Sequence, residues 1–155
     1  MNPNPYEMNP TPNEMKHPTN SKSRPWLVVG SLLAAIAVGC GAIGAHFLEE
    51  WVAKNFEDPE RRLELWETAS RYVMYHALGL LAVGLAEFAS NFRRNLVGAV
   101  MLIGVILFSG CLYAYVLSNV KPLVHIVPLG GMSMIVAWLM LAFFAMTNSS
   151  NDDGA

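Results

Sequence analysis

The stretch Leu96–Leu117, LVGAVMLIGVILFSGCLYAYVL, contains no charged side chain. A bilayer core about 30 Å thick is crossed by about 20 apolar helical residues, so this stretch is long enough to span a membrane. Three similar runs occur at Trp26–His46, Val73–Phe88 and Leu123–Met146. One formal charge, Glu87, lies within the four runs, and it stands near the end of the second. The pattern therefore predicts a small membrane protein with four spanning helices.

The composition supports this class. Hydrophobic residues make up 54% of the chain and charged residues 14%, against about 25% charged residues in an ordinary soluble domain. The charges gather between the runs, because an unpaired charge at the bilayer centre costs at least about 2.5–3.5 kcal/mol. The net charge of −2 gives no indication of nucleic-acid binding. We expect an all-α, integral membrane four-helix bundle, whose first partner is the lipid bilayer.

The four-helix domain is expected to cover residues 25–147, with helices at about 26–46, 73–88, 96–117 and 123–146. The short connections between the last three runs favour antiparallel neighbours. The Asn- and Pro-rich residues 1–24 and the polar residues 148–155 are expected to be disordered tails. A cleaved signal peptide is the alternative for the first run, but signal cores are about 7–15 residues long and this run is longer.

The polar segment before the second run is expected to form a short amphipathic helix at the membrane interface. Asp58 and Pro59 are typical of a helix N-cap and first position, and apolar residues then recur at helical spacing. Orientation is poorly determined, because five Lys and Arg residues lie on each side. Lys22 and Arg24 adjoin the first helix, which favours cytoplasmic termini and a plasma (inner) membrane location.

Polar residues inside the runs gather at one end of the expected bundle, near the 47–72 segment. In an up-and-down arrangement they share one leaflet, and Tyr72, Tyr75 and His76 share one helix face. The simpler interpretation is an aromatic belt with interhelical hydrogen bonds. A metal, haem or proton site on two histidines is the alternative, although two ligands underfill a four-ligand site, so no metal or cofactor is predicted. The candidate cluster comprises His46, Tyr72, Tyr75, His76, Ser109 and Tyr113.

Small residues indicate close helix packing, since they let membrane helices approach one another. The stretch from Gly39 to Gly44 also matches the dinucleotide-binding glycine fingerprint, but it ends an apolar run and has no strand–helix–strand context. Pro128 falls inside the fourth run and is expected to bend it. The candidate helix-packing residues are Ala37, Gly41, Gly44, Ala45, Gly110, Pro128, Gly130 and Gly131.

Four motifs in order suggest a family. They are Gly41-Ala-Ile-Gly-Ala-His46, Trp66-Glu-Thr-Ala69 with the following Tyr72 and Tyr75-His-Ala-Leu78, Leu107-Phe-Ser-Gly-Cys-Leu-Tyr113, and Pro128-Leu-Gly-Gly131. Across residues 26–146 the chain resembles the domain-of-unknown-function 423 family, which includes YgdD-type bacterial inner-membrane proteins and the eukaryotic transmembrane protein 256. Ile43, Cys111 and Val127 depart from the usual residues. The resemblance implies a four-helix membrane protein with no assigned reaction.

These observations favour a non-enzymatic protein that acts through helix-packing contacts with an unidentified membrane-protein partner or with a second copy of itself. The alternative is a small transporter or an ion- or proton-binding protein that uses the polar cluster. A membrane enzyme has the least support, because no nucleophile–base pair and no acidic cluster occurs within the runs.

Overall fold

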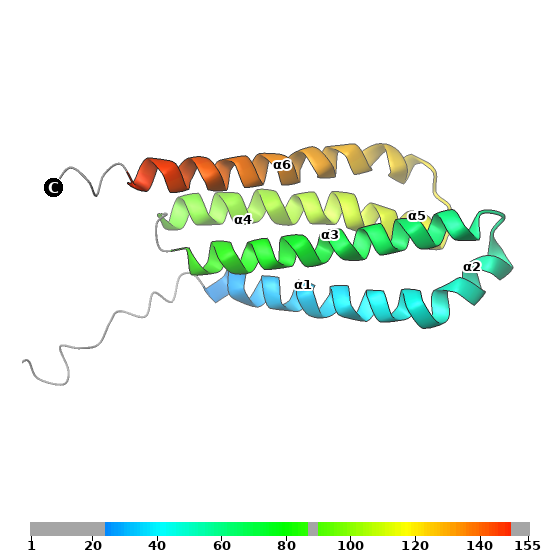
Figure 1. Ribbon diagram of the computed structural model, residues 1–155. Helices are drawn as coiled ribbons and strands as arrows, with labels where there is room; N and C mark the ends of the chain where they lie inside the picture. Colours follow the sequence, from blue (N-terminus) through cyan, green and yellow to red (C-terminus); the bar gives the residue numbers. More distant parts are fainter. Residues whose placement is uncertain (1–23, 87–89, 150–155) are drawn as a thin grey trace, which may run out of the picture.

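The computed structural model describes residues 24–86 and 90–149, and every regular element within these ranges is a helix. The elements are α1 (Arg24–Ile43), η2 (Gly44–Leu48), α2 (Glu49–Asn55), α3 (Pro59–Leu85), α4 (Asn91–Val105), η3 (Ile106–Gly110), α5 (Cys111–Ser118) and α6 (Pro122–Ser149), where η denotes a π-helical segment. They form four antiparallel rods, packed in the order α1, α3, α4 with α5, and α6 (Figure 1). The structure confirms the predicted all-α membrane bundle.

Three segments of the described chain are long and apolar enough to cross a membrane, namely Pro25–Asn55, Asn91–Ser118 and Pro122–Thr147. Helix α3 does not reach this level of hydropathy, because its first half is charged. It nevertheless runs along the bundle between α1 and α4 (Figure 1). The neighbouring helices bury one face of α3. Its packing therefore identifies α3 as the fourth rod of the bundle, although its hydropathy does not.

The bundle core receives residues from every rod. Ala37 of α1, Val73 of α3, Val105 of α4 and Met134 of α6 form one buried cluster. Burial of apolar side chains contributes less inside a bilayer than in water, since lipid is itself apolar, and close packing takes its place. The small side chain of Ala37 fits that requirement, because it allows α1 to approach the other rods.

The amphipathic segment after Asp58 is helical from Pro59, as its sequence predicts, and it runs into the second apolar run as one helix. It is the first part of α3, because Trp66 and Ala69 are buried against the bundle in line with Val73. The side chain of Asp58 makes no capping bond to the helix. The short separate helix before α3 is α2, whose first turn carries two glutamates.

Several helix ends differ from the predicted runs. Helical structure continues past residue 46 through η2 into α2, and α3 begins fourteen residues before position 73 and ends at Leu85. Helix α6 continues to Ser149, so the first two residues of the predicted tail 148–155 are helical. It also passes through Pro128 as one helix. Residues 1–23 and 150–155, which make up the remainder of the predicted tails, lie outside the described ranges.

A buried arginine joins α3 to the end of α5. The side chain of Arg62 is 2% exposed, and its Nη1 donates to the main-chain oxygens of Val116 and Tyr115 at 2.8 and 3.2 Å. Its Nε donates to Asp58 at 2.7 Å, and Nη2 donates to the side-chain oxygen of Asn119 at 2.7 Å. The guanidinium therefore bonds to carbonyl groups of the last turn of α5, of which the Tyr115 oxygen also accepts from the Asn119 N–H.

A second arginine has the same role at the opposite end of the bundle. Arg94 of α4 is 5% exposed, and its Nη1 donates to the main-chain oxygen of Ala86 at 2.9 Å, just beyond the end of α3. Its Nη2 donates to the side chain of Asn91. Positive charge at a helix C-terminus is also favoured by the helix dipole. Both ends of the bundle are thus held by an arginine that bonds to the carbonyl end of a neighbouring helix.

Candidate functional site

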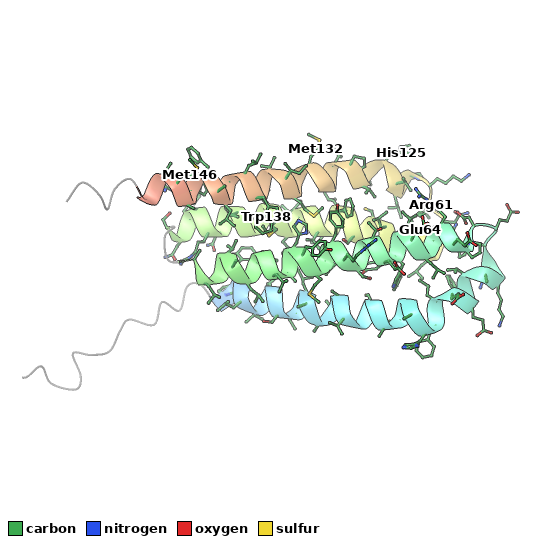
Figure 2. All side chains as sticks on the ribbon, viewed as in Figure 1. Arg61, Glu64, His125, Met132, Trp138 and Met146 are labelled. Atoms are coloured by element: carbon green, nitrogen blue, oxygen red, sulfur yellow. The ribbon has the colours of Figure 1, made fainter. Side chains whose placement is uncertain are left out.

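The structure divides the predicted polar cluster into separate groups. Ser109 and Tyr113 belong to a hydrogen-bonded network near the α2 end of the bundle, whereas Tyr72 and His76 line a cavity nearer its middle. Tyr75 lies on the outer face of α3 and is 56% exposed. The end of the bundle that contains α2 also carries Arg61 and Glu64 on α3, as Figure 2 shows.

The network near the α2 end links three rods. The Trp66 indole donates from Nε1 to the main-chain oxygen of Cys40 at 2.7 Å, and Ser70 Oγ donates to the main-chain oxygen of Trp66 at 3.0 Å. Ser70 Oγ also shares a 2.9 Å hydrogen bond with Tyr113 Oη, and the Trp66 and Tyr113 rings meet edge to face at 4.5 Å. Ser109 Oγ donates to a main-chain oxygen of α3 at 3.0 Å. These bonds indicate a structural role.

The structure does not support the alternative of a site built on both His46 and His76. His46 is exposed in η2, and its nearest ring contact is with the adjacent Phe47. The antiparallel register places Gly44 against Trp66, which precedes His76 by ten residues, or roughly 15 Å at the rise of an α-helix. The two histidines therefore belong to different depths of the bundle and share no site.

A cavity of 330 Å³, here called the His76 cavity, lies between α3, η3 and α6. Two aromatic rings flank the imidazole: Tyr72 stacks on it at 6.0 Å, and Trp138 lies 6.3 Å away. A third ring of the cavity, Phe108, contacts Tyr72 at 4.6 Å. Trp138 lies near the middle of the bundle's length (Figure 2). The lining residues are Tyr72, His76, Phe108, Gly131, Met134, Ile135 and Trp138.

The hydrogen bond of His76 fixes its neutral tautomer. Nδ1 lies 2.7 Å from the main-chain oxygen of Tyr72, and because a carbonyl oxygen only accepts, Nδ1 carries the proton. Nε2 of the neutral ring is then an acceptor, and it has no hydrogen-bond partner among the described residues. Every fully buried side-chain nitrogen or oxygen in the described residues has a hydrogen-bond partner. Because Nε2 has no partner, it is accessible, although the residue is 5% exposed.

A second cavity, of 260 Å³, lies between the end of α1 and the first half of α3 and is here called the α1/α3 groove. Trp66 fills the space next to Gly44, where an added Cβ would lie 2.8 Å from Cδ1 of the indole. An added Cβ at Gly41 would meet nothing within 4 Å. The lining residues are Gly41, Gly44, Ala45, Trp66, Glu67, Ser70 and Arg71.

Two charged residues of the groove, Glu67 and Arg71, are here called the groove charges. Both are exposed and stand four residues apart on α3. Arg71 makes a long 3.4 Å hydrogen bond to Thr68 Oγ1. The ion pairs of the described residues are Lys54–Glu50, Arg61–Glu64 and Arg62–Asp58, so neither groove charge has an ion-pair partner there. The sequence suggested no special role for this pair.

The glycine fingerprint therefore contributes small residues to a groove and not to a phosphate-binding turn. It lies within α1 and η2, and no strand precedes it in the described part of the chain. A dinucleotide site needs the glycines between a strand and the start of a helix, so this geometry does not support one.

The other predicted packing positions are of two kinds. Gly130 of α6 is in tight contact with η3, because an added Cβ would lie 2.8 Å from the carbonyl carbon of Leu107. Gly131 is more open, with the Phe108 ring 3.8 Å from an added Cβ, and Gly110 has nothing within 4 Å. Pro128 lies inside α6 without interrupting the helix. Gly130 is thus a site of close helix contact, whereas Gly110 is not.

The described residues hold no group of three or more His, Cys, Asp or Glu side chains arranged to bind a metal ion. A cavity of 640 Å³ opens at the α2 end beside Arg62. Sequence reasoning missed this arginine, whose signals are the four-residue spacing from Asp58 and the Asn119 that ends α5. Its donors already bond to protein groups, which indicates a structural role.

Comparison with known proteins places the chain in a defined group. Residues 40–131 match the family described as "Protein of unknown function (DUF423)". The chain is 40% identical over 116 residues to the UPF0382 membrane protein SSP2132 of Staphylococcus saprophyticus, covering 75% of this chain and 92% of the relative. It is 38% identical over 123 residues to the UPF0382 membrane protein YwdK of Bacillus subtilis, covering 78% and 95%. No solved structure is significantly similar to the chain.

Proposed function

The chain belongs to the DUF423 family of proteins of unknown function, and from this premise we propose that it catalyses no reaction and acts by helix packing, with the α1/α3 groove binding a transmembrane helix. Its relatives carry membrane-protein names without a reaction. The observation that carries the proposal is the pair of exposed, unpaired charges in the groove. A transport or ion-binding site on His46 and His76 lacks support, since the two residues lie far apart.

The helix register shows how deep the groove charges lie. Gly44 of α1 packs against Trp66 of α3, and Gly30 packs against Ala77. The residues of α3 between Trp66 and Ala77 therefore lie beside residues 44 to 30 of the first helical rod, and both groove charges fall in the part of this interval nearest the α2 end. At this depth α1 exposes apolar side chains, among them Val38, which is 64% exposed. The charges thus stand on a surface whose neighbours are suited to lipid.

Lipid chains cannot satisfy these charges. A charged side chain at the bilayer centre costs about 2.5–3.5 kcal/mol or more, so such residues usually face a protein or water-filled interior and pair there. The adjoining Gly41 and Ala45 are exposed and small, which lets the backbone of another helix come close. A transmembrane helix that offers both signs of charge fits this surface better than lipid does.

A second copy of this chain offers such a helix. The groove charges have opposite signs and stand one helical turn apart, about 6 Å along the axis. A two-fold axis along the bilayer normal brings the same surface of both subunits together at the same depth, so Glu67 of each protomer would pair with Arg71 of the partner subunit by reaching about one helical turn along the axis. Two ion pairs would then replace four unpaired charges. We therefore assign the groove to self-association through α3.

Charge exchange tests this assignment. The protein is labelled with donor and acceptor dyes, reconstituted at low density in phosphatidylcholine vesicles, and its self-association is measured by energy transfer. Glu67→Arg and Arg71→Glu should each weaken association about tenfold or more, because each places like charges opposite one another. The double variant Glu67→Arg/Arg71→Glu should restore it. The matched control is Glu64→Arg on the same helix, whose 70% exposed side chain should leave association unchanged.

The outcomes separate the components of the proposal. A monomeric wild-type protein in vesicles would overturn the assignment to a second copy. Association that both single variants leave intact would overturn the role of the groove charges. Substrate turnover or transport by the purified protein would contradict the non-enzymatic, contact-based function as a whole.

We extend the proposal to location and orientation. The start of α1 and the end of α6 lie at the same end of the bundle, together with the start of α4 (Figure 1). We place this end in the cytoplasm and the protein in the plasma (inner) membrane, since Lys22 and Arg24 adjoin the first helix and Arg93 lies at the same end. Reporter fusions at the C-terminus and at residue 57 should report opposite sides, with the C-terminal fusion cytoplasmic. The reverse result would refute the orientation.

A further inference from the structure

The His76 cavity has the size and position of a site for one small ring. Its volume is 330 Å³, near the lower end of the roughly 300–1,000 Å³ typical of ligand pockets. Its lining residues come from α3, η3 and α6, and one of them, Trp138, lies near the middle of the bundle's length (Figure 2). Its occupant would therefore come from the bilayer and would be lipid-soluble.

The rim of the cavity faces outward. Ile135 of α6 and Tyr72 of α3 line the cavity and are 60% and 38% exposed. Gly131 leaves space between these helices because it has no side chain. The nearest atoms to a Cβ added at this position belong to the Phe108 ring, 3.8 Å away. A molecule that diffuses in the bilayer could enter between α3 and α6 without separation of the bundle.

The cavity walls favour an aromatic ligand. The rings of Tyr72 and Trp138 lie 6.0 and 6.3 Å from the His76 imidazole, and Phe108 packs on Tyr72 at 4.6 Å. Aromatic pairs prefer separations of about 4.5–7 Å and gain about 0.5–1.5 kcal/mol beyond area burial. A flat ring bound among them would make the same kind of contact.

The single polar feature is the free acceptor of His76. Since Nδ1 donates to the oxygen of Tyr72, the accessible Nε2 of the neutral ring can accept a hydrogen bond but cannot donate one. The ligand must then bring the donor. A hydroxyl group on an aromatic ring meets this requirement, whereas a carbonyl group on the same ring does not.

We propose that the His76 cavity binds the hydroxylated aromatic ring of a lipid-soluble quinol, with the quinol hydroxyl donating to Nε2 of His76. This site is distinct from the α1/α3 groove, which uses other residues, and it does not depend on self-association. The geometry assigns binding only, with preference for the reduced, hydroxyl-bearing ring over the oxidised ring.

The test compares two probes of almost the same shape. Duroquinol and duroquinone share the tetramethylated ring and differ in two hydroxyl hydrogens. Binding is measured anaerobically by equilibrium dialysis against purified protein in phosphatidylcholine nanodiscs, with empty nanodiscs as the blank for partition into lipid. One net hydrogen bond should make duroquinol bind about 3- to 10-fold more tightly than duroquinone.

Two variants locate the binding. His76→Phe keeps an aromatic ring but removes the acceptor, so the two probes should bind equally. Gly131→Leu should fill the cavity and remove saturable binding of both probes, since its Cβ itself fits. The matched control is Gly39→Leu on α1, where an added Cβ meets nothing within 4 Å and binding should be unchanged.

Several results would overturn the inference. They are the absence of saturable binding in the wild-type protein, equal affinity of the wild type for the two probes, and saturable binding that survives in Gly131→Leu. A preference for duroquinol that persists in His76→Phe would exclude Nε2 as the acceptor. If His76→Phe fails to fold, as judged by size exclusion and circular dichroism, the probe comparison and Gly131→Leu decide the matter.

Discussion

Replacement of Arg62 by methionine should destabilise the protein strongly. The guanidinium makes hydrogen bonds to Asp58, Val116, Tyr115 and Asn119, and its side chain is 2% exposed. Methionine would occupy a similar volume but would leave the main-chain oxygen of Val116 without the Arg62 donor, whereas the Tyr115 oxygen keeps the Asn119 N–H and the Asp58 carboxylate is 44% exposed to solvent. A buried polar group left unsatisfied typically costs about 1–3 kcal/mol, and we expect a loss in this range.

The assay is reversible unfolding in mixed micelles with increasing dodecyl sulfate, followed by far-ultraviolet circular dichroism. The neighbouring Arg61→Met is the matched control, because the Arg61 side chain is 67% exposed and lies 3.7 Å from Glu64. Exposed pairs of this kind contribute little, so the control should change stability by less than about 0.5 kcal/mol. Equal effects of the two variants, or a loss below about 1 kcal/mol for Arg62→Met, would refute the structural role of Arg62.

The same unfolding titration tests two further changes. Gly130→Ala should lower the free energy of unfolding by about 1–3 kcal/mol, because the added Cβ meets the backbone of Leu107 at 2.8 Å. Gly131→Ala should be tolerated. Equal losses in the two variants would contradict the tight contact of α6 with η3. Tyr113→Phe removes one hydrogen bond to Ser70 and should cost about 0.6 kcal/mol, as is average for such bonds in membranes. A loss above about 2 kcal/mol would show a larger role for this network.

The four rods were predictable because charge segregation is strong. The apolar run from Leu96 to Leu117 accounts for most of α4, η3 and α5, and short connections imply antiparallel neighbours. The length of α3 was not predictable from hydropathy, because its first half is charged on the face that the bundle leaves open. The π-helical segments η2 and η3 also left no signal in the apolar pattern.

The sites were predictable only in part. The motif around Tyr72 and His76 does line a cavity, because its three- and four-residue spacing puts those side chains on one face. The pairing of His46 with His76 was wrong because helix register, and not membrane side alone, determines which residues meet. The spacing of Arg62 from Asp58 was too weak a signal to predict its role, since an arginine in a charged segment has the same appearance in sequence whether it faces solvent or a helix end.

Crosslinking in native membranes tests the α1/α3 groove most directly. A photo-reactive benzoylphenylalanine is placed at Ala45, which is exposed and lines the groove, or at Ala35, which is exposed on α1 but is not among the groove residues. We predict an adduct of twice the 17.0 kDa chain mass from position 45 and little from position 35. No adduct, equal adducts from both positions, or an adduct with lipid alone would contradict helix binding in the groove.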